Sequence, residues 1–170
     1  MKRSIRNGAE MDFINDEKLN VARTNEQELY IPNVLTDTVS WDESFDYLTK
    51  VVEEESNIKL PGKYFTIVTH TAHTHIHKVH VVNEHLKNIK NRNDYPVEAH
   101  MYMGLTGMSE SFGPHSDDCE VLFWQCIGRT QWTVNDNIYI LCPSDCIYVP
   151  RGMQHDVKSL SPRMGISFGF

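Results

Sequence analysis

The sequence predicts one mainly β domain, a sandwich or barrel, with a helical segment before it. The main observation is a series of short β-rich runs separated by turns, which continues from residue 63 to the C-terminus. A second observation is the helical spacing of apolar residues over 41–55, which predicts a helix there. A chain of 170 residues is long enough for one domain with its own core. The sequence shows no internal repeat and no second domain boundary.

The elements follow a simple order along the chain. Residues 1–28 are polar and rich in Asn, Glu and Lys, so we expect a loosely ordered N-terminal arm. One domain then covers residues 29–170, and LPG at 60–62 ends its helical region. NEHLKNIKNRNDYP is predicted as a polar loop or short helix. The predicted strands are YFTIVTH, HIHKVHVV, VEAHMYMGLT, CEVLFWQCI, TQWTV, NIYILC, CIYVP and RMGISFGF.

Composition excludes several classes of protein. The net charge of −7 argues against nucleic-acid binding, because neutralising phosphates requires a basic surface. No apolar run is long enough to span a membrane. The basic residues at the N-terminus are not followed by an apolar run, so they do not form a secretory signal. CPSDC lacks two further soft ligands at a comparable spacing for a zinc site. We therefore expect a reduced, cytoplasmic protein with buried thiols. The cysteines are Cys119, Cys126, Cys142 and Cys146.

Two segments carry the predicted chemistry, GPHSDDCEVLFWQCIGRTQWTV (113–134) and PSDCIYVPRGMQHDV (143–157). His115 and Asp117 are two residues apart, so on a strand both side chains reach toward the same point. A sharp turn before His155 can bring that side chain back to them. Two imidazoles and one carboxylate on one face of a metal leave positions open for a co-substrate and O2, as in non-haem Fe(II) oxygenases.

Both segments resemble the motifs of the cupin superfamily. SDCIYVPRGMQH (144–155) fits the second cupin motif, with Ser144 in place of its glycine. His115, Asp117, Glu120 and Gly128 represent the first motif, and its usual second histidine is an aspartate here. This resemblance implies a double-stranded β-helix (cupin or jelly-roll) barrel with an N-terminal helical segment. The metal-binding core would cover about residues 98–170.

Within that superfamily, the chain is similar to the JmjC-type 2-oxoglutarate oxygenases, particularly the ribosomal oxygenase group. After H-x-D that group continues with apolar residues and then with Gln, Gly and Trp, here Gln125, Gly128 and Trp132. The closing ISFGF is similar to its last core strand. The resemblance implies a hydroxylase that uses Fe(II), 2-oxoglutarate and O2, with the metal held by the H-x-D pair and His155. Its substrate would be a protein or peptide side chain, or a small molecule.

The residue that anchors 2-oxoglutarate departs from this pattern. JmjC-type enzymes hold the far carboxylate with a Lys or Arg at the position of Thr130. Prolyl-hydroxylase-type enzymes supply an Arg on the last strand, and Arg163 lies eight residues beyond His155. A carboxylate inside a barrel needs a paired cation or several donors. We therefore predict Arg163 as the anchor, with help from the Thr130 hydroxyl. Arg129 is the second choice, and Tyr102 is a further candidate of the cofactor site.

The histidine-rich run HTAHTHIHKVH, residues 70–80, holds five of the nine histidines. On a strand, His73, His75 and His77 would share one face. The run has no nearby thiolate or carboxylate and lies outside the metal-binding core. We therefore interpret it as surface or as the lining of a substrate groove, rather than as a second metal site.

Two other functions stay open at this point. A cupin metalloenzyme that needs no 2-oxoglutarate is supported by Thr130, which stands where a basic residue is expected. A non-catalytic cupin binding module is the third candidate. Glu120 is an alternative fourth metal ligand of the cupin kind. Many cupins form dimers, so the resemblance also allows a homodimer.

Overall fold

Two antiparallel sheets form the body of the protein in the computed structural model, which describes residues 16–53, 58–59, 66–89, 96–109 and 111–170. The strands are β1 (Leu29–Ile31), β2 (Ile58–Lys59), β3 (Thr66–Thr69), β4 (Glu98–Gly104), β5 (Val121–Ile127), β6 (Thr130–Val134), β7 (Asn137–Leu141), β8 (Cys146–Val149), β9 (His155–Ser159) and β10 (Arg163–Gly169). The helices are α1 (Asp16–Thr24), α2 (Trp41–Glu53), α3 (Ala72–His75) and α4 (His77–Ile89). None of these helices is long and apolar enough to cross a membrane.

The order of the strands is that of a jelly roll. The larger sheet runs β1-β8-β5-β10-β4-β3-β2 and the smaller sheet runs β7-β6-β9. From β5 onward the chain alternates between the sheets: β6 and β7 lie in the smaller, β8 in the larger, β9 in the smaller and β10 in the larger. An isolated bridge joins His115 to His155, so the chain at His115 extends the smaller sheet beside β9. The predicted cupin-like, mainly β fold with a few helices is confirmed.

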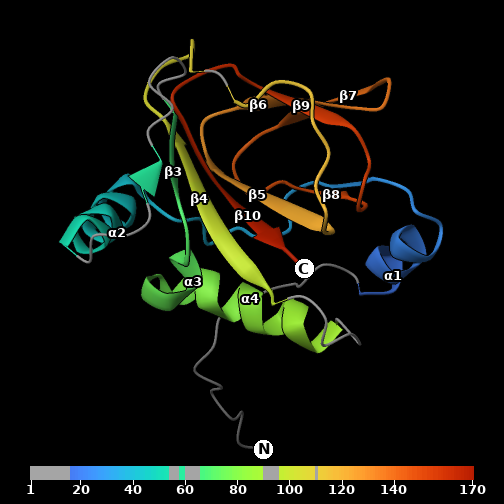
Figure 1. Ribbon diagram of the computed structural model, residues 1–170, viewed down its shortest axis with the longest axis horizontal. Helices are drawn as coiled ribbons and strands as arrows, with labels where there is room; N and C mark the ends of the chain where they lie inside the picture. The colour runs from blue at the N-terminus through green and yellow to red at the C-terminus, as the bar shows by residue number, and fades with distance from the viewer. Residues whose placement is uncertain (1–15, 54–57, 60–65, 90–95, 110) are drawn as a thin grey trace, which may run out of the picture.

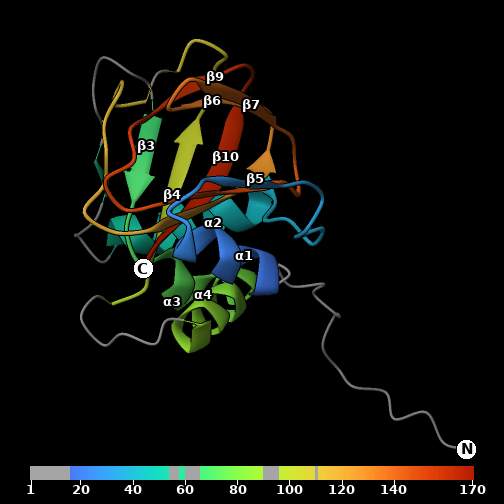
Figure 2. The same ribbon diagram turned by 90° about the vertical axis from the view of Figure 1, so that its right-hand side faces the viewer.

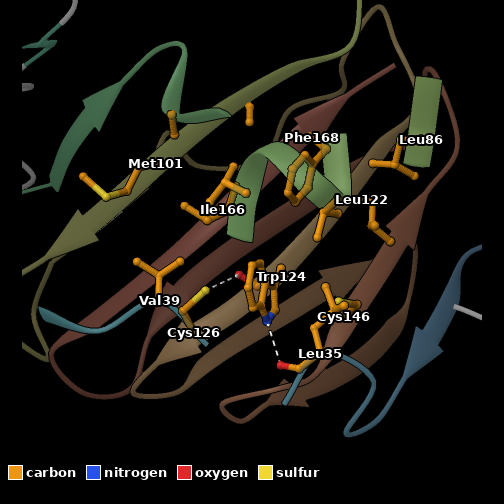
Figure 3. Packing of buried hydrophobic residues seen from close by; sticks show 14 of the residues in the cluster. Leu35, Val39, Leu86, Met101, Leu122, Trp124, Cys126, Cys146, Ile166 and Phe168 are labelled. Carbon is orange, nitrogen blue, oxygen red and sulfur yellow. Dashed lines mark hydrogen bonds between the residues drawn. The ribbon is translucent and has the colours of Figure 1, made fainter. Parts of the chain in front are cut away.

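Each face of the larger sheet has its own core. Figures 1 and 2 show the smaller sheet on one side of it and helices α3 and α4 on the other. Met101, Trp124 and Phe168 point toward the helices, and Figure 3 shows them packed together. Phe123 and Tyr102, which alternate with these residues along β5 and β4, belong to the cluster between the sheets. Burying each of these large side chains contributes about 2 kcal/mol.

Most predicted elements are present at the expected places. The helix predicted over 41–55 is α2, and a capping box fixes its start. The backbone N–H of Ser40 donates to Glu43 Oε2 at 2.8 Å, and the backbone N–H of Glu43 donates to Ser40 Oγ at 3.2 Å. Seven of the eight predicted strands correspond to β3, β4, β5, β6, β7, β8 and β10.

The strand prediction for HIHKVHVV is wrong, because this run lies in α3 and α4. Its apolar residues also follow helical spacing: Ile76, Val79 and Val82 are buried, and so is Leu86, one turn further along α4. So short a run could not decide between the two periods. His73, His75 and His77 therefore do not share a strand face.

Two further differences concern short polar segments. β9 was not among the predicted strands, since Val157 is the one apolar residue in HDVKS. Residues 16–24 of the predicted loose arm form α1, whose Leu19 is fully buried. Arg23 holds this helix to the barrel, because its Nε donates to Glu120 Oε2 at 2.6 Å and its guanidinium lies 5.5 Å from the Phe170 ring centroid. Residues 1–15 lie outside the described residues.

Gly128 at the turn between β5 and β6 provides a test of the fold. Its φ is +71°, and a Cβ there would collide with the backbone oxygen of Pro162. We expect Gly128→Ala to lower the free energy of unfolding by roughly 2–4 kcal/mol, measured by urea denaturation. Gly107→Ala is the control, because its Cβ would come no closer than 3.7 Å to Leu160 O. Equal losses in both variants would contradict this reading of the turn.

Candidate metal centre

His115, Asp117 and His155 come together in space and could hold a metal ion. Each offers one ligand atom, and the three atoms lie within 4.8 Å of one another. His155 Nε2 is 3.5 Å from Asp117 Oδ2, and the two imidazole centroids are 4.3 Å apart. Two imidazoles and one carboxylate suit Fe(II) and other divalent first-row metals. The structure thus brings together the three residues that the sequence analysis predicted as metal ligands.

Backbone hydrogen bonds fix the positions of these three residues. The N–H of His115 donates to His155 O at 2.9 Å, and the N–H of His155 donates to His115 O at 2.8 Å. The N–H of Gly152 donates to Asp117 O at 2.9 Å, which ties the turn before β9 to the H-x-D segment. The spacing of the ligands is therefore set by main-chain pairing between segments far apart in sequence.

Both histidines hold their Nδ1 atoms against carbonyl oxygens. His115 Nδ1 lies 2.7 Å from Gly113 O, and His155 Nδ1 lies 3.1 Å from Met153 O. A carbonyl oxygen only accepts, so Nδ1–H is the donor and Nε2 of each neutral ring is left with a lone pair for a metal. Burial lowers the pKa of His155 below its ordinary value, which further favours the neutral, metal-binding form.

The three candidate ligands line one narrow cavity of about 30 Å³ together with Arg163 and Tyr102. The other lining residues are Ser111, Phe112, Val121, Phe123, Trp132, Val157 and Ser167. Tyr102 has its pKa raised to about 12, chiefly by burial and then by the charge of Asp117. The cavity therefore combines a candidate metal site, a cation and aromatic walls.

Arg163 is the cation of this cavity, and it is 1% exposed. Its Nε donates to Ser159 Oγ at 2.7 Å, whereas its buried Nη2 has no hydrogen-bond partner among the residues that the structure describes. Burial lowers the pKa of Arg163 to about 10. A buried cation is costly unless an anion pairs with it. Arg163 is therefore a buried cation with a donor free for an anion.

Thr130 and Arg129 do not line this cavity. The Thr130 hydroxyl is fully buried and donates to Gln125 Oε1 at 2.7 Å. Gln125 Nε2 in turn donates to Ile127 O at 2.6 Å, so Thr130 belongs to a network at the end of β5. The Arg129 side chain is exposed. Of the predicted candidates for the co-substrate, Arg163 and Tyr102 are the two that face the metal ligands.

Other residues of interest are placed elsewhere or were missed. Glu120, considered above as a fourth ligand, pairs with Arg23 and is not part of the ligand group. Ser167 was missed, although its alternation with Arg163 on β10 could have indicated it. Phe112 was missed because it lies in a Gly- and Ser-rich loop with no periodic pattern.

The histidine-rich run contacts β4. His70 Nδ1 lies 3.1 Å from His100 Nε2, and the backbone N–H of Ala99 donates to His73 Nδ1 at 3.3 Å. Within the described ranges, the run contributes to no group of three candidate metal ligands. Its role as surface or groove lining stays a prediction.

Comparisons with known proteins show what fold this chain shares. YcfD, a ribosomal oxygenase from Escherichia coli, has been solved in complex with cobalt and succinic acid and in complex with cobalt and 2-oxoglutarate. Each structure matches with a TM-score of 0.68 and 16% identity, over 92% of this chain and 51% of that chain. A further X-ray structure of E. coli YcfD matches with a TM-score of 0.67 and 15% identity, over 95% and 54%.

No protein-family model and no curated protein sequence matches the chain. The chain spans about half the length of YcfD. At this level of identity, the likeness shows a shared fold: this chain has the jelly-roll architecture that YcfD has.

Proposed function

We propose that the protein is an Fe(II)- and 2-oxoglutarate-dependent oxygenase that hydroxylates a C–H bond. One observation carries the proposal: a 2-His-1-carboxylate group and a buried, incompletely paired guanidinium line the same cavity. A metal and a dicarboxylate are the ligands that satisfy these two features together. YcfD, which shares the fold, is a ribosomal oxygenase solved with cobalt and 2-oxoglutarate, and this supports the proposal.

The residues present fit these groups. His115, Asp117 and His155 would hold the metal, and the Nη2 of Arg163 would donate to the far carboxylate of 2-oxoglutarate. The Tyr102 hydroxyl is a further donor in the same lining. When bound, Fe(II) supplies the coupling of O2 reduction to 2-oxoglutarate decarboxylation, which yields succinate, CO2 and a hydroxylated substrate.

Aromatic side chains form part of the wall of the cavity beside the candidate metal site. The Phe123 and Trp132 ring centroids are 4.8 Å apart, and Trp132 stacks on the His155 ring at 5.6 Å. Phe123 fits because Gly165 has no side chain: a Cβ there would collide with the Phe123 ring. Side chains on β10 point alternately to its two faces, so Arg163, Gly165 and Ser167 share one face. The ring of Phe123 therefore occupies the space at Gly165, between two polar residues. Because Arg163 is buried, its pairing with a carboxylate would be stronger than at the surface.

A wider groove adjoins this cavity and offers room for the substrate. The groove measures about 380 Å³ and shares Ser111, Phe112 and Val157 with the cavity. The cavity itself has room for about two waters, so 2-oxoglutarate requires the wall to move. Phe112 is 49% exposed and lies between the two spaces. Its outward movement would join them, which provides a route for co-substrate and substrate.

The substrate class that we propose is a protein or peptide side chain, with a small molecule as the alternative. The net charge of −7 disfavours nucleic acid. A cytoplasmic location and a homodimer also stay proposals.

Turnover of 2-oxoglutarate tests the proposed function. Protein loaded with Fe(II) is mixed with 2-oxoglutarate and O2, with and without a library of peptides, and succinate is measured by mass spectrometry. We expect succinate from the wild type and none from Asp117→Ala. A protein that binds metal but neither binds nor consumes 2-oxoglutarate would instead be a cupin metalloenzyme of another kind. A protein that binds no metal would be a non-catalytic cupin module.

A further inference from the structure

We propose that Trp132 is a second hydrogen-bond donor to 2-oxoglutarate, through its indole Nε1–H. The inference rests on the proposed function and adds a positioning residue to it. In the sequence Trp132 is part of the family pattern, and in the structure it is part of the cavity wall. Its polar atom, rather than its ring, is the feature that points to a ligand.

The first observation is that the Trp132 Nε1–H is buried without a partner. Trp132 is 3% exposed, and its Nε1 has no hydrogen-bond partner among the residues described. An indole N–H can only donate, so it needs an acceptor from the protein, from water or from a ligand. Leaving such a donor unpaired is costly, and most buried donors in proteins are paired.

The second observation is that Trp132 shares its cavity with Arg163 Nη2, another buried donor without a partner in the described part of the chain. The two residues come from different sheets, Trp132 from β6 and Arg163 from β10. Two residues with unpaired buried donors therefore line one cavity from different sheets, which favours a ligand rich in acceptors. A carboxylate offers about four acceptor positions, more than one guanidinium fills.

The third observation is that packing fixes the Trp132 ring. Its plane lies within 17° of the His155 ring, and it is tilted by 52° against Phe123. The direction of its N–H is therefore set before any ligand binds, which lowers the entropic cost of the hydrogen bond. Because the ring stacks on His155, a candidate metal ligand, the indole would orient a bound co-substrate close to the metal site.

Trp124 is the matched control within the same chain. It is also buried, at 1% exposure, but its Nε1–H donates to Leu35 O at 3.2 Å, as Figure 3 shows. Trp124 lies in the core on the helix side of the larger sheet, and it does not line the cavity. The two tryptophans thus differ in whether the protein itself supplies the acceptor.

Trp132→Phe and Trp124→Phe remove an indole N–H while keeping an aromatic ring. Calorimetry without O2 gives the affinities for Mn(II) and for 2-oxoglutarate on the Mn(II) protein, and urea denaturation gives the unfolding midpoint. We expect Trp132→Phe to weaken 2-oxoglutarate binding by about tenfold or more, with Mn(II) affinity close to that of the wild type. We expect Trp124→Phe to bind Mn(II) and 2-oxoglutarate as the wild type does. Its urea midpoint should fall further than that of Trp132→Phe, because it loses a hydrogen bond within the protein.

The outcomes separate this inference from the proposed function. Wild-type affinity for 2-oxoglutarate in Trp132→Phe would overturn the role of the indole N–H and leave the oxygenase proposal intact. An equal weakening of Mn(II) binding in that variant would show that Trp132 acts only by supporting His155, which also overturns the inference. A wild-type protein that binds Mn(II) but not 2-oxoglutarate would overturn both proposals.

Discussion

Arg163→Met is expected to weaken 2-oxoglutarate binding by roughly 100-fold or more while making the protein without co-substrate more stable. The two effects have one cause, the buried guanidinium. With 2-oxoglutarate bound, the guanidinium would pair with a carboxylate. Without it, the cation is desolvated and incompletely paired. Burial lowers the pKa of Arg163 from its ordinary value to about 10, which corresponds to roughly 3 kcal/mol of destabilisation. The hydrogen bond to Ser159 offsets about 1 kcal/mol of this in the wild type.

The sign of the pH dependence follows from the same shift in the pKa of Arg163. Between about pH 10 and the higher, ordinary pKa of arginine, the unfolded chain binds the proton more tightly than the folded protein does. The destabilisation is therefore fully present below about pH 10 and decreases as the pH rises through that range. At neutral pH, Arg163→Met should raise the free energy of unfolding by roughly 1–3 kcal/mol, measured by urea denaturation.

Arg129→Met is the control for this prediction, because its side chain is exposed and does not line the cavity. It should bind 2-oxoglutarate as the wild type does in calorimetry on the Mn(II) protein without O2. If Arg129→Met lost binding and Arg163→Met kept it, the anchor would be Arg129. If Arg163→Met were less stable than the wild type, the interpretation of Arg163 as an unpaired cation would be wrong.

Asp117→Ala is expected to lower the affinity for Mn(II) or Fe(II) by more than about 100-fold. The variant removes the carboxylate of the ligand group and leaves two neutral imidazoles, which hold a hard divalent ion poorly. Metal should raise the unfolding temperature of the wild type, since it binds the folded state, and should not raise that of the variant. Metal content after dialysis and thermal unfolding with added Mn(II) check both expectations.

Asp118→Ala controls for a general loss of negative charge near the site. Asp118 is the next residue along the chain, its side chain is exposed, and it is not part of the ligand group. Its metal affinity should stay within a few-fold of the wild type. Metal retained by Asp117→Ala, or an equal loss in both variants, would contradict the assignment of Asp117.

The spacing of short strands and turns predicted a β sandwich or barrel, and the resemblance to cupins implied the jelly roll. The three candidate ligands could be predicted because they depend on local spacing. H-x-D places two side chains on one side of an extended segment, and the turn at 150–152 precedes His155. The β10 strand was also readable as a strand. The sequence did not show which side chains of this and the neighbouring strands face the cavity. Arg163, Arg129 and Thr130 therefore remained alternatives for the anchor.

What the sequence could not provide depends on contacts between distant segments. The run at 70–80 fits both alternation and helical spacing, and burial of Val79 and Leu86 against the sheet decides for the helix. The absence of an acceptor at Trp132 Nε1 is a property of the packed cavity, so no pattern of residues indicates it. The loop that carries Phe112 has no period from which its position could be inferred.

The paired backbone hydrogen bonds between His115 and His155 have a consequence for how such a protein can diversify. Two main-chain bonds hold the candidate ligands together, so their separation depends little on the identity of nearby side chains. The exposed apolar residues Leu105, Met108 and Phe112, which precede His115, can then change without displacing that backbone pairing. Such a division would let this surface vary while the candidate metal ligands keep their arrangement.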